Sequence, residues 1–262
     1  MAKAKVQRKV AMSLMAHPDD CEILAGGTMV LLQQRGWEVH VVTMTPGDAG
    51  SATLGPVEIA AIRRKEAAKA AAVIGAEYHC LEARDFYVNY DSEQSRRALE
   101  IMRDIAPSLV FTHSLDDYMM DHEMAARLAR CGTFGYAVPN ASPRPVVKGS
   151  MVPYLYYADP LEGIDVYGYE IQPSTYVDIS KAMATKTKML RCHASQRDWL
   201  LKHHGVDEYT RAMKAWCAKR GKENGTRYAE AFRQHKGHPY PNDCLLAREL
   251  GDLVIHPDEI PF

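Results

Sequence analysis

Short apolar runs alternate with longer helix-forming stretches through the first ~140 residues of the chain. The apolar runs predict strands at residues 10–15, 38–44, 77–81 and 108–112. The stretches between and after them predict helices at residues 23–34, 58–74, 92–105 and 124–136. This alternation specifies a parallel α/β sheet with right-handed crossovers and helices on its faces.

The second half of the chain is less regular. Residues 143–157 are typical of a loop followed by a strand, and residues 175–179 of a further strand. Helical patterns cover residues 181–204 and 208–234, the second with a break near its glycines. We therefore expect a single domain over 1–262, with a core at about 9–180 and C-terminal helical additions at about 181–262.

Composition and charge exclude several classes of protein. Lys plus Arg total 32 against 33 Asp plus Glu, so no global charge favours nucleic acid. An apolar content of 47% excludes intrinsic disorder. No run approaches the ~18 apolar residues of a membrane span. Six cysteines without a CxxC pair predict reduced thiols in a cytoplasmic protein.

A dense titratable cluster follows the first predicted strand. The segment MAHPDDCE holds His17, Asp19, Asp20 and Glu22 within six residues. In parallel α/β sheets, ligands bind beyond the carboxyl ends of the strands. His17 and Asp20 can supply nitrogen and oxygen ligands to a divalent metal, and a catalytic zinc needs three such ligands. Asp19 points differently in a turn and is free to act as a general base.

A second cluster follows the predicted strand at 108–112. It contains His113, Asp116, Asp117, Asp121 and His122. If the two strands are neighbours, this cluster supplies the third metal ligand, and spacing alone leaves His113 and His122 open. Asp121 can alternatively act as the N-cap of the next helix. Two clusters at two strand ends favour a functional site over capping alone.

Four segments resemble a known family. They are AHPDDCEILAGGT, TPGDAGS, IRRKEAAKAAAVIGA and DYMMDH, and together they cover roughly residues 9–130. They closely resemble the LmbE-like de-N-acetylases, the group with glucosaminyl-phosphatidylinositol and N-acetylglucosaminyl-thiol-precursor deacetylases. KMLRCHASQ at 188–196 resembles a further family segment. The resemblance implies a Rossmann-like fold and a mononuclear zinc hydrolase that removes an acetyl or acyl group from an amino-sugar-like substrate.

The resemblance also implies roles for individual residues. By motif position, His17, Asp20 and His122 are the zinc ligands, and Asp19 is the general base. Asp121 is expected to hydrogen-bond to a metal ligand or to the base and so to orient it, without binding the metal itself. The same donor set would also accept iron, manganese or cobalt.

Substrate-binding candidates come from two further segments. Arg63 falls where the family carries a substrate-contacting arginine, although an ion pair with Glu66 on the helix surface is an equal alternative. The loop at 45–51 (TPGDAGS), with Gly47 and Asp48, is a candidate acceptor of the substrate's polar groups.

The second motif departs from the family at one position. The family usually reads HxDH, and its first histidine stabilises the oxyanion or protonates the leaving amine. Met119 stands there in this chain, and a thioether cannot donate a hydrogen bond. Tyr118 or a histidine from elsewhere, with His193, His235 and His238 as candidates, can take over this role.

Because Met119 replaces the family histidine, two alternative functions stay open. The chain can be an amidase of the same fold on a different amide, or a metal-binding module with weak or lost catalysis. A nucleotide-binding Rossmann module is disfavoured, because no GxGxxG follows the first strand. The expected partner is a small acylated amine, and the family makes a homo-oligomer plausible.

Overall fold

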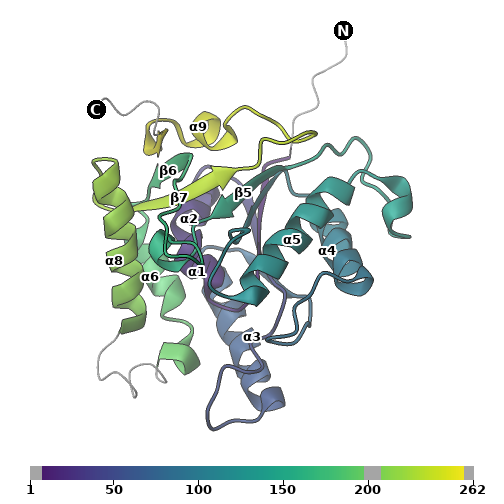
Figure 1. Cartoon of the computed structure of the whole chain (residues 1–262), viewed down its shortest axis with the longest axis horizontal. Helices are drawn as coiled ribbons and strands as arrows, with labels where there is room; N and C mark the ends of the chain where they lie inside the picture. The colour runs from purple at the N-terminus through teal and green to yellow at the C-terminus, as the bar shows by residue number, and fades with distance from the viewer. Residues whose placement is uncertain (1–7, 198–207, 257–262) are drawn as a thin grey trace.

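A single mixed sheet organises the chain. The computed structural model describes residues 8–197 and 208–256. Eight strands form this sheet in the order β3-β2-β1-β4-β5-β7-β6-β8 (Figure 1). They are β1 (Val10–Met15), β2 (Glu38–Thr43), β3 (Glu77–Cys80), β4 (Leu109–Thr112), β5 (Tyr154–Ala158), β6 (Thr175–Asp178), β7 (Ala229–Gln234) and β8 (Val254–Ile255).

Helices cover both faces of the sheet, which confirms the predicted α/β class. They are α1 (Asp20–Leu24), α2 (Gly26–Gln34), α3 (Pro56–Ala72), α4 (Ser92–Ile105), α5 (Met120–Gly135), α6 (Met183–Leu190), α8 (Glu208–Glu223) and α9 (Leu245–Leu250). In Figure 1, α4 and α5 lie on one side of the sheet, and α1, α2, α6 and α8 lie on the other. Within the described residues, no helix is both long and apolar enough to cross a bilayer.

The strand order places a ligand-binding crevice beside β1. The five strands from β3 to β5 pair in parallel, whereas β7 pairs antiparallel with β5 and β6, and β8 antiparallel with β6. The chain runs outward from β1 through β2 to β3 and then returns to β4 on the other side of β1. Ligands of open α/β sheets bind at such a switch point, beyond the carboxyl ends of the strands.

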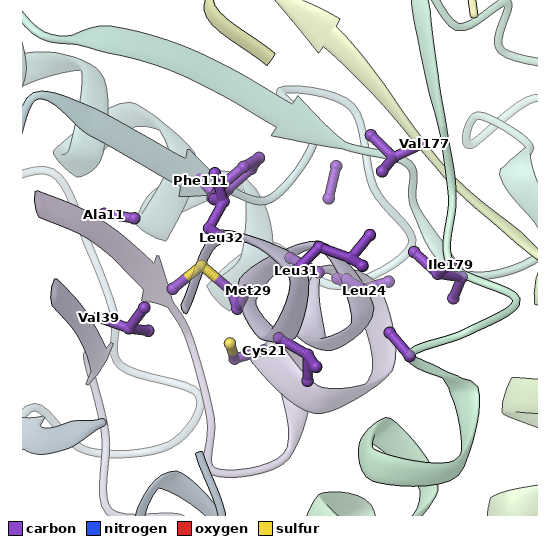
Figure 2. Close-up of a cluster of buried hydrophobic side chains, with 14 of the residues drawn as sticks. Ala11, Cys21, Leu24, Met29, Leu31, Leu32, Val39, Phe111, Val177 and Ile179 are labelled. Atoms are coloured by element: carbon purple, nitrogen blue, oxygen red, sulfur yellow. The ribbon is translucent and has the colours of Figure 1, made fainter. Parts of the chain in front are cut away.

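The side chains of each strand alternate between the two faces of the sheet and contribute to a hydrophobic core on each face. Because successive side chains point to opposite faces, every second residue of a strand meets the same helical layer. Ala11 and Val39 pack with Met29 and Leu32 of α2, and Figure 2 shows these side chains around α2 together with Phe111 of β4. The intervening residues of β1 pack instead against α4 and α5.

Most predicted elements are confirmed, and one is wrong. The bounds predicted for β1 and α4 match the structure, and most other elements shift by a few residues. The single helix predicted at 23–34 is divided at Ala25 into α1 and α2. The predicted helix at 208–234 ends at Glu223, and 229–234 form strand β7. β7 is a strand because it pairs with two neighbours and buries Phe232 in the core. The predicted helix at 181–204 is interrupted after α6, and its part at 198–204 lies outside the described residues.

The C-terminal segment holds the start of α2 in place. The Glu230 carboxylate of β7 accepts hydrogen bonds from the backbone N–H groups of Gly27 and Thr28, both at 2.7 Å. The same carboxylate lies 2.5 Å from the Lys186 ammonium, and both side chains are buried. A carboxylate at a helix N-terminus is favoured by the helix dipole. The late strands are thus part of the same sheet, which supports the proposal of one domain.

The buried pair predicts a large loss of stability on truncation. Glu230→Ala leaves the Lys186 ammonium buried without its partner, and this should lower the free energy of unfolding by about 3–5 kcal/mol. Urea denaturation measures the effect. Glu93→Ala is the matched control, because it removes an exposed partner of Arg97 and should cost less than about 1 kcal/mol. Equal losses in the two variants would contradict this assignment.

Candidate metal centre

The two predicted clusters meet at the switch point. β1 and β4 are adjacent parallel strands, so the loops that follow them leave the sheet side by side. The HPDD loop after β1 and the start of α5 line a cavity of about 510 Å³. His17, Asp20 and His122 all line it. The structure therefore brings together the three residues predicted as metal ligands.

The potential ligand atoms of these residues lie close together. One ligand atom from each of His17, Asp20 and His122 lies within 4.8 Å of the others. His17 Nδ1 is 3.4 Å from Asp20 Oδ2, and His122 Nε2 is 3.6 Å from Asp20 Oδ1. Two imidazole nitrogens and one carboxylate form the donor set of a catalytic zinc site with a further position for water or substrate.

Each of the two imidazoles is oriented by a second carboxylate. Asp121 Oδ2 lies 3.2 Å from His17 Nε2, and Asp117 Oδ1 lies 2.9 Å from His122 Nδ1. These contacts leave His17 Nδ1 and His122 Nε2 facing Asp20. Carboxylates in this position fix the tautomer and raise the basicity of a ligating histidine. The contact predicted for Asp121 is present, while Asp117 carries an orienting contact that the sequence did not single out.

His113 lies behind the site rather than in it. A second group, His113, Asp117 and His122, also has ligand atoms within 4.8 Å of one another. However, His113 Nε2 lies 3.0 Å from the Ala16 N–H and 3.1 Å from Asp20 Oδ2. The His113 ring stacks on His122 with centroids 4.0 Å apart and does not line the cavity. Geometry thus favours His122 as the third ligand.

The charges of the cluster suit a cation. Burial alone would lower the pKa of His17, but Asp121 and Asp20 outweigh burial and raise the pKa to about 10. Burial opposes ionisation of Asp20, yet His122 and His113 hold the pKa of this carboxyl well below its usual range. Asp20 is therefore an anion at neutral pH, and a bound metal would displace a proton from His17.

Asp19 turns away from the ligand group. Its backbone has φ 99°, ψ −26°, in the left-handed region that non-glycine residues rarely adopt. Asp19 Oδ2 lies 3.3 Å from an Arg63 nitrogen and accepts a hydrogen bond from the Tyr209 hydroxyl. Burial raises the pKa of Asp19, and Arg63 opposes the shift. Backbone strain of this kind concentrates at functional sites.

Arg63 is a buried part of the site. Its guanidinium donates to the Pro18 carbonyl at 2.7 Å and lines the cavity. The alternative ion pair with Glu66 is not formed, because Glu66 accepts two hydrogen bonds from Ser195 instead. A Cβ at Gly47 would come within 2.5 Å of the guanidinium, so this glycine makes room for Arg63.

Two candidates do not reach the cavity. Asp48 accepts hydrogen bonds from the Asp85 N–H at 2.8 Å and from Arg84 Nε at 3.2 Å, so it anchors a neighbouring loop. It lies outside the cavity lining, and its contact with substrate stays a prediction. His193 is fully buried, lies 3.5 Å from Glu22 Oε2 and likewise does not line the cavity.

Met119 itself lines the cavity, and Tyr118 stands beside it. The Tyr118 ring meets the His122 ring edge-on, with centroids 5.3 Å apart, and the side chain is largely exposed. His235 and His238 line a different hollow, beside α4 and α5. Among the replacements considered for the missing histidine, the structure therefore brings only Tyr118 to the described cavity lining.

Some lining residues were missed by the sequence. Asp85 and Phe86 follow β3 and line the cavity, and the Phe86 N–H donates to Asp121 at 2.7 Å. The strand-end rule that singled out the HPDD loop could have found them. Tyr209 of α8 and Gln196 also line the cavity. Gln196 ends the family-like segment at 188–196, whereas no motif or strand end marks Tyr209.

A family model described as GlcNAc-PI de-N-acetylase, PIG-L, matches residues 12–131. These residues form a PIG-L family domain. The match confirms the resemblance carried by the HPDD loop and the DYMMDH segment. The matched residues include the three ligand candidates. The cavity is also lined by Tyr209, which lies outside the matched residues.

Known proteins similar to this chain include enzymes of two kinds. Diacetylchitobiose deacetylase of Thermococcus kodakarensis is 28% identical over 239 residues, which are 86% of this chain and 82% of the relative. 4-Oxalmesaconate hydratase of Pseudomonas putida is 27% identical over 212 residues, 78% of each chain. The solved structure of N,N'-diacetylchitobiose deacetylase from Pyrococcus horikoshii with its inhibitor matches with a TM-score of 0.73 and 29% identity, covering 89% of this chain and 87% of that one.

The orienting carboxylate of His122 gives a testable prediction. Asp117→Asn removes the charge behind the imidazole and should weaken zinc binding about 10- to 100-fold in a chelator competition assay. Asp116→Asn is the matched control, because Asp116 accepts from the Val166 N–H instead and touches no ligand candidate. Unchanged affinity in Asp117→Asn would contradict the role of this contact.

Proposed function

We propose that this PIG-L protein is a zinc-dependent hydrolase that removes an acetyl or acyl group from the amine of an amino-sugar-like substrate. The observation that carries the proposal is the three-ligand group beside Asp19, a separate carboxylate in the same cavity. The deacetylase relatives support the reaction class.

Zinc fits the donor set of His17, Asp20 and His122. When bound, zinc lowers the pKa of water to about 7 and polarises a carbonyl. Asp19 takes a proton from the attacking water and returns it to the departing amine. Burial, which raises the pKa of Asp19, suits this exchange, and the Tyr209 hydroxyl holds the carboxylate in place.

Tyr118 is the proposed donor to the developing oxyanion. Met119 cannot supply a hydrogen bond. The Tyr209 hydroxyl already donates its proton to Asp19, whereas the Tyr118 hydroxyl has no hydrogen-bond partner among the described protein groups. Partial loss of water around its hydroxyl at the cavity, together with the negative charge of Asp20, raises the pKa of Tyr118, so its phenol keeps its proton near neutral pH. Tyr118 therefore replaces the usual histidine.

Hydration is the second candidate reaction, because one relative is a 4-oxalmesaconate hydratase. Hydrolysis is the first candidate, because the matching family model is described as a de-N-acetylase and two relatives are deacetylases.

Two wider expectations remain part of the proposal. A cytoplasmic location fits the free thiols of all six cysteines. The partner is a small acylated amine, and assembly into a homo-oligomer stays a prediction. Assays on N-acetylglucosaminides and on a panel of other N-acyl amines separate the amino-sugar hydrolase from an amidase with another substrate.

Asp19→Asn tests the base. The variant should release acetate from N-acetylglucosaminides about 10²- to 10⁴-fold more slowly, because an amide cannot take the proton. Its zinc content should equal that of the wild type. Asp104→Asn, an exposed carboxylate paired with Arg144, is the control and should keep full activity.

Full acetate release by Asp19→Asn would exclude the assigned role. Wild-type protein that hydrates an unsaturated carboxylate and releases no acetate would favour the second candidate. Wild-type protein that turns over neither substrate class would favour a metal-binding module.

Tyr118→Phe tests the oxyanion donor. Loss of the hydroxyl should lower kcat about 10²- to 10³-fold and leave KM nearly unchanged. Tyr87→Phe is the matched control, since Tyr87 is exposed to a similar extent and does not line the cavity. If both variants keep wild-type kcat, another group stabilises the oxyanion.

A further inference from the structure

A second group of histidines and carboxylates lies on β2 and β3, outside the cavity. The two strands pair in parallel, with His40 opposite Glu77 and Val42 opposite His79. Because side chains alternate along a strand, Glu38, His40, Glu77 and His79 point to the same face of the sheet. β3 is the edge strand there. The fold thus gathers two imidazoles and two carboxylates at this edge.

Three of these side chains converge on one point. His40 Nδ1 lies 3.0 Å from His79 Nε2 and 3.8 Å from Glu77 Oε2. One ligand atom from each of the three lies within 4.8 Å of the others. In a tetrahedral zinc site with bonds of 2.0–2.1 Å, two ligand atoms are about 3.3 Å apart. The distances from His40 to His79 and to Glu77 each lie within about half an ångström of this separation.

The fourth side chain orients His40. Glu38 Oε1 lies 3.0 Å from His40 Nε2 and accepts the proton of that nitrogen. His40 Nδ1 then carries a lone pair, which faces His79 and the Glu77 carboxylate. A carboxylate behind a ligating histidine is the usual support of a metal site. His79 Nε2 is within hydrogen-bond distance of that lone pair, and a divalent cation between the two nitrogens and the Glu77 carboxylate would take the place of the shared proton.

We propose that His40, His79 and Glu77 form a second divalent metal site that clips the edge strand β3 to β2. Two imidazoles with one carboxylate select zinc and similar borderline cations over magnesium or calcium. His40 is buried, whereas the Glu77 side chain is 68% exposed. One ligand is therefore held in position by packing, and the site is accessible from solvent on the side of Glu77.

This inference does not depend on the proposed reaction. The pair His40 and Glu77 lies near the start of β2 and β3, whereas the cavity lies beyond the carboxyl ends of the strands. Removing the second site should therefore leave zinc at the centre formed by His17, Asp20 and His122. Metal content and stability, not activity, are the readouts.

The test uses untagged full-length protein and zinc chloride. His122→Ala removes one ligand of the cavity centre and isolates the second site for calorimetric titration and thermal unfolding. His79→Ala and Glu77→Gln are then added singly to this background. Both positions are at least partly exposed, so folding should survive. Glu58→Gln, at the exposed start of α3, is the matched control.

We expect the His122→Ala protein to bind one zinc ion and to melt at a higher temperature with zinc than without. Addition of His79→Ala should weaken this binding about a hundredfold and abolish the shift, and Glu58→Gln should change neither. In the wild-type background, His79→Ala should lower the zinc content from two ions to one. Zinc binding that persists in the double variant, or wild-type protein that holds only one zinc, would overturn the proposal.

Discussion

The parallel pairing of β1 with β4 is the contact on which the site depends. It places the loops after two strands, almost 100 residues apart in sequence, at one edge of the sheet. The Asp20 carboxylate then lies between side chains of both loops, with His17 on one side and His113 and His122 on the other. A shift of one residue in this pairing would turn the ligand side chains to the wrong face.

The left-handed turn at Asp19 separates two carboxylates that are neighbours in sequence. Asp20 points to the imidazoles, and Asp19 points to Arg63 and Tyr209. Their pKa values move in opposite directions, lowered for Asp20 and raised for Asp19. Two carboxylates with different proton affinities can divide metal binding and proton transfer between them.

Sequence predicted most of the first 140 residues because strand and helix periodicities are strong there. The convergence of strand ends predicted His17 and Asp20 with a third ligand from the second cluster, and the family resemblance selected His122 over His113. It failed at β7, where tertiary pairing overrides a helix-like pattern. Tyr209 could not be predicted either, because its contact with Asp19 depends on how α8 packs against a loop 190 residues away.

The central claim is that His17, Asp20 and His122 hold one metal ion at the edge of the sheet. Anomalous diffraction at the zinc absorption edge, from crystals of zinc-loaded protein, tests this claim most directly. We expect a peak in the cavity at about 2.0–2.2 Å from His17 Nδ1, His122 Nε2 and an Asp20 oxygen. A cavity without a peak, or a peak bonded to His113 and Asp117 instead, would contradict it.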